Sequence, residues 1–340
     1  MRVLLIGGNG FIGPAVVQGL RRAGVEVTLF HRENRSGTDP DVNHILGDRN
    51  DLAAHAAAFR KLAPDVVIDF ILSSGRQARS LMEAFRGVAG RVVALSSIDV
   101  YRACGILHGS EPGPVQPTPL TEESELRTVS RTCPEEVVKK ARKNLPWLDD
   151  EYDKIQVEQA VMSESELPGT VLRLPFVYGP GDKNHRLFPM VKRMDDGRKV
   201  ILLIEEWAQW VAPRGFVESV AAAIVAATVA ERARGRIYNV AEPEHYSDLE
   251  WARAIARVAG WEGEIRIIPS ERAPQHLKRH GNPRQHWSAD STRIRSELGY
   301  SEPVALNAAL RATIAWERAN PPAEIDPAQF DYAAEDACLD

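Results

Sequence analysis

The sequence predicts an α/β protein built on a doubly wound parallel sheet of the Rossmann type. A short apolar run at residues 3–6 is followed by a glycine-rich turn, and then by apolar residues at helical spacing. A second apolar run, at residues 25–30, arrives within about 30 residues of the first, as a strand–helix–strand unit requires. Further strand-like and helix-like segments alternate after it, which is typical of parallel strands joined by crossover helices.

The glycine-rich turn is the first candidate site. Gly7, Gly10 and Gly13 have the spacing G-x-x-G-x-x-G between the predicted strand and helix. Without side chains, the backbone can turn tightly, a pyrophosphate can approach the helix N-terminus, and helix and strand can pack closely. We therefore expect these glycines, with Phe11 and Ile12 between them, to bind a dinucleotide.

The other elements of the first half follow in order. We predict strands over residues 25–30, 42–46, 65–72 and 91–95, and helices over residues 12–20, 52–62 and 77–85. The carboxyl ends of parallel strands share one edge of the sheet, so this edge is the expected ligand site.

The end of the second strand bears on the choice of cofactor. His31 and Arg32 stand where an NAD-binding fold places an acidic residue against the adenosine ribose. An arginine there suits a ribose 2′-phosphate, so NADP is preferred over NAD, although a solvated arginine at a strand end is an equally good interpretation. Asp48 and Arg49, after the third strand, are further expected cofactor contacts.

Several motifs occur in a fixed order along the chain. The predicted strand at 91–95 leads into Ser96-Ser97-Ile98-Asp99-Val100-Tyr101, and later segments read LRLPFVYGPGD (172–182), RGFV (214–217), IYNV (237–240), DSTR (290–293) and ELGY (297–300). Together they resemble the extended short-chain dehydrogenase/reductases, the NAD-dependent epimerase/dehydratase family, over roughly residues 1–318. Arg102 departs from the pattern, which has glycine there.

The resemblance implies a catalytic group. Ser97 would donate a hydrogen bond to a carbonyl, Tyr152 would relay the proton, and Asp99 would be an auxiliary acid or base, unless it is an exposed loop carboxylate or a helix cap. In the family's Y-x-x-x-K pair, the tyrosine passes the proton, and the lysine holds the nicotinamide ribose and lowers the pKa of the tyrosine. Here Gln156 stands at the lysine position. Gln156 can still bond ribose hydroxyls, whereas Lys154 would lie about 200° around a helix from Tyr152.

Substrate contacts are also implied by the resemblance. Arg214 matches a position that contacts a diphosphate, Arg279 loosely matches a second one, and Tyr178 belongs to the Y-G-P-G-D stretch. Two arginine forks would clamp two phosphates. The alternative for Arg279 is a solvated basic loop over residues 272–284. His276 and His280 have ligand-like spacing without a third ligand, so no metal is expected.

The resemblance also implies two domains. A Rossmann domain would comprise residues 1–169 and about 214–241, and a smaller α/β substrate domain residues 170–213 and 242–320. Residues 321–340 read as an acidic tail that packs on the surface or is disordered. A charged stretch at 122–150, with an amphipathic helix after Pro134, is expected to cover the site as a lid.

Composition limits the partners. A net charge of −5 and an isoelectric point near 6.0 argue against nucleic acid. The chain has no apolar run of the ~18 residues that a membrane span needs, and its three cysteines lack metal or disulfide spacing, so we expect a cytoplasmic protein. A homodimer is a further expectation.

The resemblance therefore predicts hydride transfer between NAD(P) and a hydroxyl or ketone of a sugar nucleotide or similar small molecule, by an epimerase, dehydratase or reductase. The alternative is a dinucleotide-binding regulatory or scaffold protein of the same fold that has lost turnover, which Gln156 favours and the intact Ser97 and Tyr152 oppose.

Overall fold

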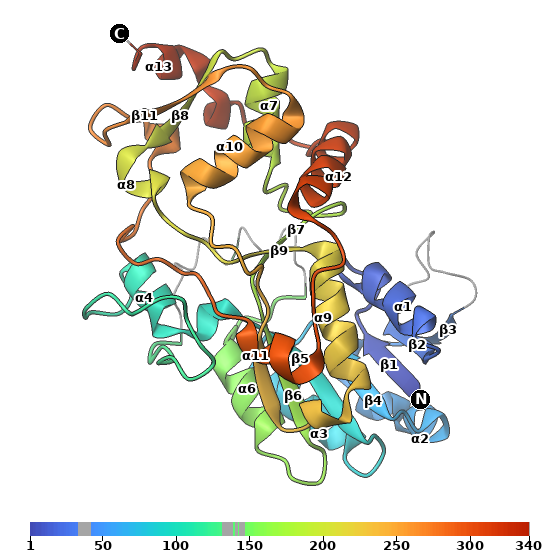
Figure 1. Cartoon of the computed structure of the whole chain (residues 1–340). Helices are drawn as coiled ribbons and strands as arrows, with labels where there is room; N and C mark the ends of the chain where they lie inside the picture. The colour runs from blue at the N-terminus through green and yellow to red at the C-terminus, as the bar shows by residue number, and fades with distance from the viewer. Residues whose placement is uncertain (33–41, 131–138, 140–141, 143–146, 340) are drawn as a thin grey trace.

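The computed structural model describes residues 1–32, 42–130, 139, 142 and 147–339. Its centre is a seven-stranded sheet in the order β10-β6-β5-β4-β1-β2-β3, in which all neighbours run parallel (Figure 1). The strands are β1 (Arg2–Ile6), β2 (Glu26–His31), β3 (Asn43–Leu46), β4 (Val66–Asp69), β5 (Arg91–Ser97), β6 (Gly169–Leu174) and β10 (Arg236–Asn239). The predicted fold class is confirmed.

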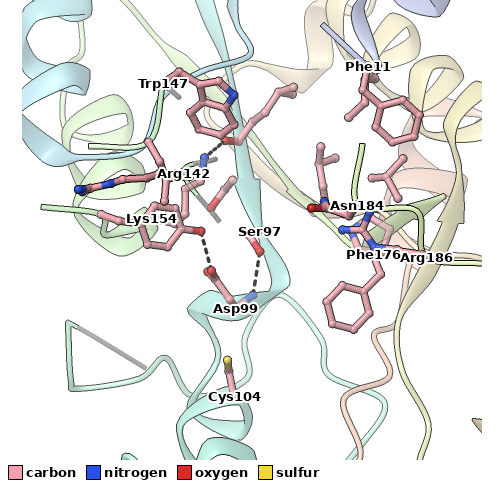
Figure 2. A pocket seen from close by; sticks show the side chains of 18 of the residues that line it. Phe11, Ser97, Asp99, Cys104, Arg142, Trp147, Lys154, Phe176, Asn184 and Arg186 are labelled. Atoms are coloured by element: carbon pink, nitrogen blue, oxygen red, sulfur yellow. Dashed lines mark hydrogen bonds between the residues drawn. The ribbon is translucent and has the colours of Figure 1, made fainter. Parts of the chain in front are cut away.

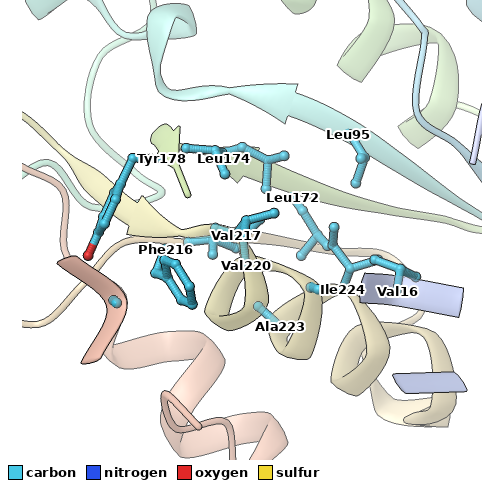
Figure 3. Packing of buried hydrophobic residues seen from close by; sticks show 14 of the residues in the cluster. Val16, Leu95, Leu172, Leu174, Tyr178, Phe216, Val217, Val220, Ala223 and Ile224 are labelled. Atoms are coloured by element: carbon cyan, nitrogen blue, oxygen red, sulfur yellow. The ribbon is translucent and has the colours of Figure 1, made fainter. Parts of the chain in front are cut away.

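Helices cover both faces of this sheet. On one face α1 (Gly13–Arg22) packs beside α9 (Val217–Val229), and on the other α3 (Gly75–Phe85) packs beside α6 (Lys154–Met162). Figure 3 shows the first contact, where Val16 and Ile224 lie close to Leu172 of β6. The central strands are buried on both faces, because a helix layer covers each side of the sheet, as in a doubly wound fold.

Two elements have bounds that differ from those predicted from the sequence. The strand predicted over 65–72 stops at Asp69, because the Asp69 carboxylate accepts a hydrogen bond from the Ile71 amide, 2.9 Å away, and turns the chain. The helix predicted over 52–62 is replaced at its start by 3-10 turns at Arg49–Asp51 and Ala53–His55, and α2 comprises only Ala56–Leu62.

A second layer of smaller elements lies beyond the carboxyl ends of the main strands (Figure 1). It contains the parallel pair β8–β11, and β7 pairs with β9 between the layers. The elements outside the main sheet and its covering helices are α4 (Arg102–His108), β7 (Phe176–Tyr178), α7 (Phe188–Asp195), β8 (Val200–Ile204), α8 (Glu205–Ala208), β9 (Arg214–Phe216), α10 (Asp248–Ala259), β11 (Glu264–Ile268), α11 (Thr292–Leu298), α12 (Leu306–Ala319) and α13 (Tyr332–Asp336).

The two-domain partition stays a prediction, with one change that the sheet requires. Residues 170–174, assigned from the sequence to the smaller domain, lie in β6 inside the seven-stranded sheet. The tail packs on the protein: Glu335 is buried and accepts hydrogen bonds from Arg193, and its Oε1 lies 3.0 Å from His276 Nε2. The helix predicted after Pro134, and about half of the lid predicted over 122–150, fall outside the described residues.

Within the described ranges, no helix has the length and apolar character needed to cross a membrane.

A buried ion pair joins α6 to the sheet. Arg173 Nη2 of β6 lies 2.7 Å from Glu158 Oε2, and the Ser96 hydroxyl of β5 donates to Glu158 Oε1 at 2.6 Å. Arg173 also donates to the Tyr101 hydroxyl at 2.8 Å. Because these groups are almost inaccessible to water, removing one charge leaves the other without compensation.

We expect Glu158→Ala to lower the free energy of unfolding by about 3–5 kcal/mol, since it strands the Arg173 guanidinium in the core. Urea unfolding measures this. The control is Asp195→Ala, which removes the exposed pair with Arg318 and should cost no more than about 1 kcal/mol. Similar losses for the two variants would contradict the assigned role of the buried pair.

Candidate active site

Two cavities meet at the glycine-rich turn. The larger, of about 1070 Å³, extends from the turn to the carboxyl end of β5 and on to the second layer. The smaller, of about 550 Å³, extends from the turn to the ends of β2 and β3. Gly7, Gly10 and Phe11 line both cavities. The turn therefore lies at the middle of one extended site, as the strand order predicts.

The backbone of the turn is shaped for a close ligand. Gly7 has a φ of +75°, which favours glycine. A Cβ on Gly13 would lie 1.9 Å from the Gly8 carbonyl oxygen, so no side chain fits there. No side chain caps the N-terminus of α1, which leaves its first amides for an anion. These features fit a dinucleotide, and all five residues predicted here, Ile12 included, line the larger cavity.

The smaller cavity is lined by the four residues predicted at its strand ends. Arg49 is held by Asp69, at 3.0 Å, and by the Gln77 carbonyl oxygen, at 2.7 Å. His31 Nε2 lies 2.8 Å from His44 Nδ1, whereas Arg32 is exposed at the end of β2. Asp48 caps the following 3-10 turn by accepting from the Asn50 amide at 2.8 Å.

At the carboxyl end of β5 three predicted catalytic residues come together, and Figure 2 shows two of them, Ser97 and Asp99. The Ser97 hydroxyl accepts a hydrogen bond from the Asp99 amide at 3.2 Å, and this contact starts the 3-10 turn Ile98–Val100. The Tyr152 hydroxyl donates to Asp99 Oδ2 at 2.6 Å. All three side chains line the larger cavity. Asp99 is thus a partner of Tyr152, rather than an isolated loop carboxylate.

The environment of Tyr152 disfavours its phenolate. Burial raises the pKa of Tyr152 well above its usual range, and the neighbouring Asp99 charge and hydrogen bond raise it further. Asp99 Oδ1 is buried and accepts no hydrogen bond from any residue in the described part of the chain. The pair therefore presents a protonated phenol and a carboxylate with an available acceptor.

Lys154 is a site residue that the sequence argument excluded. That argument placed Tyr152 on a helix with Lys154, but α6 begins at Lys154, and Asp153 caps it by accepting from the Ile155 amide at 3.0 Å. Tyr152 precedes the helix, so both side chains line the same cavity. An aspartate directly before a helical pattern is an N-cap signal that could have located this start.

The Lys154 ammonium is buried at the edge of the sheet. It donates to the Leu95 carbonyl oxygen at 2.9 Å and to the Leu72 carbonyl oxygen. Burial lowers the pKa of Lys154 to about 8, although Asp99, Asp69 and Glu158 favour the charged form. An ammonium has three donors, so one remains for a ligand.

Gln156 does not occupy this position. Its side chain is exposed on α6, its amide lies 3.5 Å from Asp153 Oδ2, and it lines neither cavity. The expectation that Gln156 contacts the cofactor is therefore not supported by its position, because the helix starts two residues later than the sequence argument assumed.

The far end of the larger cavity has aromatic walls, to which Phe176, Trp207, Trp210 and Trp287 contribute. Arg279 also lines it, with its guanidinium carbon 3.9 Å from the Trp207 ring centre and its Nη1 2.6 Å from Asp248 Oδ2. Arg279 thus has an aromatic and a carboxylate partner, although its side chain is 42% exposed and the residues around it are exposed as well.

The other two predicted substrate residues do not line either cavity. Arg214 is held by Asp248, at 2.6 Å, and by the Tyr246 carbonyl oxygen, at 2.7 Å. Tyr178 is buried and donates to Glu242 Oε1 at 2.8 Å. Their polar groups are satisfied inside the protein, so we do not retain them as substrate ligands.

No group of three or more metal-ligating side chains occurs among the residues that were placed.

The chain matches the model of the NAD-dependent epimerase/dehydratase family over residues 3–130 and 151–241, which is more than half of its length. It belongs to this family, and the resemblance drawn from the sequence motifs is confirmed. The chain is thus an NAD-dependent epimerase/dehydratase-type enzyme.

Individual relatives are similar along nearly the whole chain. A dTDP-glucose 4,6-dehydratase from Streptomyces niveus is 26% identical and covers 94% of each chain. The structure of a dTDP-glucose 4,6-dehydratase from Bacillus anthracis in complex with NAD aligns with a TM-score of 0.65 at 17% identity, covering 94% of this chain and 97% of that one. The structure of UDP-glucuronic acid 4-epimerase from Bacillus cereus, in complex with UDP-glucuronic acid and NAD, aligns with a TM-score of 0.66 at 17% identity. The alignment covers 94% of this chain and 99% of that one.

Proposed function

We propose that this enzyme transfers a hydride between a nicotinamide dinucleotide and a hydroxyl or ketone of a sugar nucleotide or similar small molecule. The observation that supports it most is a single cavity that joins the glycine-rich turn to Ser97, Asp99, Tyr152 and Lys154. The relatives named above act on sugar nucleotides, and two of the structures contain NAD. No described feature favours the alternative of a binding protein without turnover.

The chain's own residues divide the remaining work. When bound, the nicotinamide supplies a hydride acceptor and donor. Ser97 donates its hydroxyl hydrogen to the substrate oxygen, and Asp99 and Tyr152 handle the proton. The sequence pattern puts Gln156 in place of the family's lysine, but we assign that role to Lys154, whose ammonium lies in the cavity. It would hold the nicotinamide ribose through its third donor.

Lys154→Met should weaken NAD(H) binding by about 10- to 100-fold, because it removes a hydrogen bond from a charged donor. Fluorescence titration of the apoprotein measures this without turnover. Gln156→Lys is the matched control and should leave the affinity unchanged, since residue 156 is exposed outside both cavities.

Thermal unfolding of Lys154→Met must show a folded protein for the comparison to count. If Gln156→Lys instead tightens cofactor binding while Lys154→Met leaves it unchanged, the assignment of Lys154 is wrong and the original Y-x-x-x-K register holds.

We also propose a preference for NADP over NAD. Arg32 is exposed at the end of β2 and lines the smaller cavity, and the strand ends in His31 rather than in an acidic residue. Its guanidinium would pair with a ribose 2′-phosphate.

Arg32→Ala should reduce NADP(H) affinity about tenfold and leave NAD(H) affinity nearly unchanged, because only the phosphate contact is lost. Both cofactors are titrated against the wild type and against Arg22→Ala, an exposed arginine on α1. Tighter NAD(H) binding by the wild type, or equal losses for both cofactors, would rule out the preference.

For a sugar nucleotide, Arg279 is the proposed diphosphate contact. Its guanidinium lies on the cavity wall, fixed by Trp207 and Asp248. Arg214, the other predicted contact, shares Asp248 but does not reach the wall.

Arg279→Ala should raise KM for a nucleotide sugar about 10- to 100-fold with little change in kcat, since the contact is equally strong in the ground state and transition state. Steady-state kinetics measure this, with Arg266→Ala, on exposed β11, as the control. An unchanged KM would indicate a substrate without a diphosphate at this wall.

Cytoplasmic location and a homodimer remain predictions from the sequence.

A further inference from the structure

The hydrogen bond between Tyr152 and Asp99 has a defined direction. A phenol can donate and an ionised carboxylate can only accept, so at the observed 2.6 Å the hydrogen comes from Tyr152. This separation is in the range of charge-assisted O–H···O⁻ bonds. A tyrosine that acts as a base must first lose its proton, and here that proton is already directed at Asp99.

Several groups hold the Asp99 backbone in place or interact with its carboxylate. Its amide donates to Ser97, and Arg127, anchored by the buried Asp153 at 3.0 Å, donates to the Asp99 carbonyl oxygen at 3.0 Å. Lys154 of α6 and His108 of α4 both interact electrostatically with the Asp99 carboxylate.

His108 is neutral more readily than usual, because burial lowers its pKa against the effect of Asp99. Cys104 of α4 completes the surroundings of the pair and lines the same cavity. Lys154 is therefore a neighbouring cation that interacts with the Asp99 carboxylate.

We propose that Asp99 is the proton acceptor of the reaction, and that Tyr152 relays the proton to it from the substrate. The inference rests on the proposed function and adds the direction of proton transfer. In this mechanism Tyr152 stays protonated between turnovers. In the Y-x-x-x-K pattern, by contrast, a lysine activates the tyrosine as a phenolate.

The step balances as follows. When a secondary alcohol is oxidised, its C–H hydride leaves to the nicotinamide and its C–O bond becomes C=O. The alcohol proton moves to the Tyr152 oxygen as the Tyr152 proton moves to Asp99 Oδ2. Asp99 ends the step as a neutral carboxylic acid, Tyr152 is unchanged, and reversal returns the proton to the substrate oxygen.

Two variants test the pair, and a second phenol–carboxylate pair provides controls. Asp99→Asn and Tyr152→Phe should each lower kcat about 10²- to 10⁴-fold, the usual contribution of acid–base catalysis. Tyr332, at the start of α13, donates a hydrogen bond to Asp196, which follows the end of α7. Neither residue lines either of the two cavities described above. Tyr332→Phe and Asp196→Asn should therefore leave kcat unchanged.

The pH profile and the solvent isotope effect separate the relay from other mechanisms. At saturating cofactor, wild-type kcat should not rise from neutral pH toward the range in which tyrosinate forms, because the proton acceptor is a carboxylate and not a phenolate. Its dependence on the deuterium fraction of the solvent should be curved, because two protons move together. A kcat that rises with pH in parallel with tyrosinate formation overturns the proposal, as does near wild-type kcat in Asp99→Asn.

Titration of the apoprotein gives a readout without turnover. The tyrosinate absorbance that is lost in Tyr152→Phe should appear only above the ordinary tyrosine range, and should move to lower pH in Asp99→Asn. If the wild type oxidises or reduces no alcohol or ketone, the proposed function fails. If Tyr152 ionises in the ordinary pH range of tyrosine, the proposed relay is overturned, whether or not the wild type shows turnover.

Discussion

The buried ion pair between Arg173 and Glu158 holds the site together. It connects β6 to α6, and Ser96 connects the same carboxylate to β5. Lys154 lies one helical turn before Glu158, so the pair fixes how far α6 advances toward the carboxyl end of the sheet. Ser97 follows Ser96 directly, so the contact that anchors α6 also sets the distance between Lys154 and the catalytic end of β5. A charge pair in this position costs desolvation, and its main contribution is to specify one arrangement of strand and helix.

The sequence was sufficient where structure depends on neighbouring residues, and insufficient where it depends on distant ones. The turn from Gly7 to Gly13 and its flanking elements were predicted correctly, because periodicity and glycine spacing are local properties. The start of α6 was predicted wrongly, since it depends on Asp153, which both caps the helix and pairs with Arg127. From residue spacing alone, the predicted helix included Tyr152.

The same distinction explains the substrate residues. Arg214 and Tyr178 lie in motifs that resemble the family's, but each is satisfied by a carboxylate remote in sequence, Asp248 or Glu242. Asp248 also holds Arg279, so one negative charge is shared by two guanidinium groups. This leaves a surplus positive charge beside aromatic walls at the far end of the cavity. Such an end suits a ring stacked on indole with an anionic group near Arg279.

A proton acceptor near a nicotinamide can be obtained in two physical ways. A lysine can lower the pKa of a phenol until the phenolate forms near neutral pH, or a carboxylate can receive the proton while the phenol stays neutral. The first needs a cation close to the tyrosine oxygen. The second needs a carboxylate within hydrogen-bond distance of it, which the half-buried Asp99 provides at 2.6 Å. With the second arrangement, Lys154 does not have to activate the phenol, and its ammonium interacts with the Asp99 carboxylate instead. The departure from Y-x-x-x-K is then consistent with an active enzyme, because the groups that transfer the proton are still assembled at the end of β5.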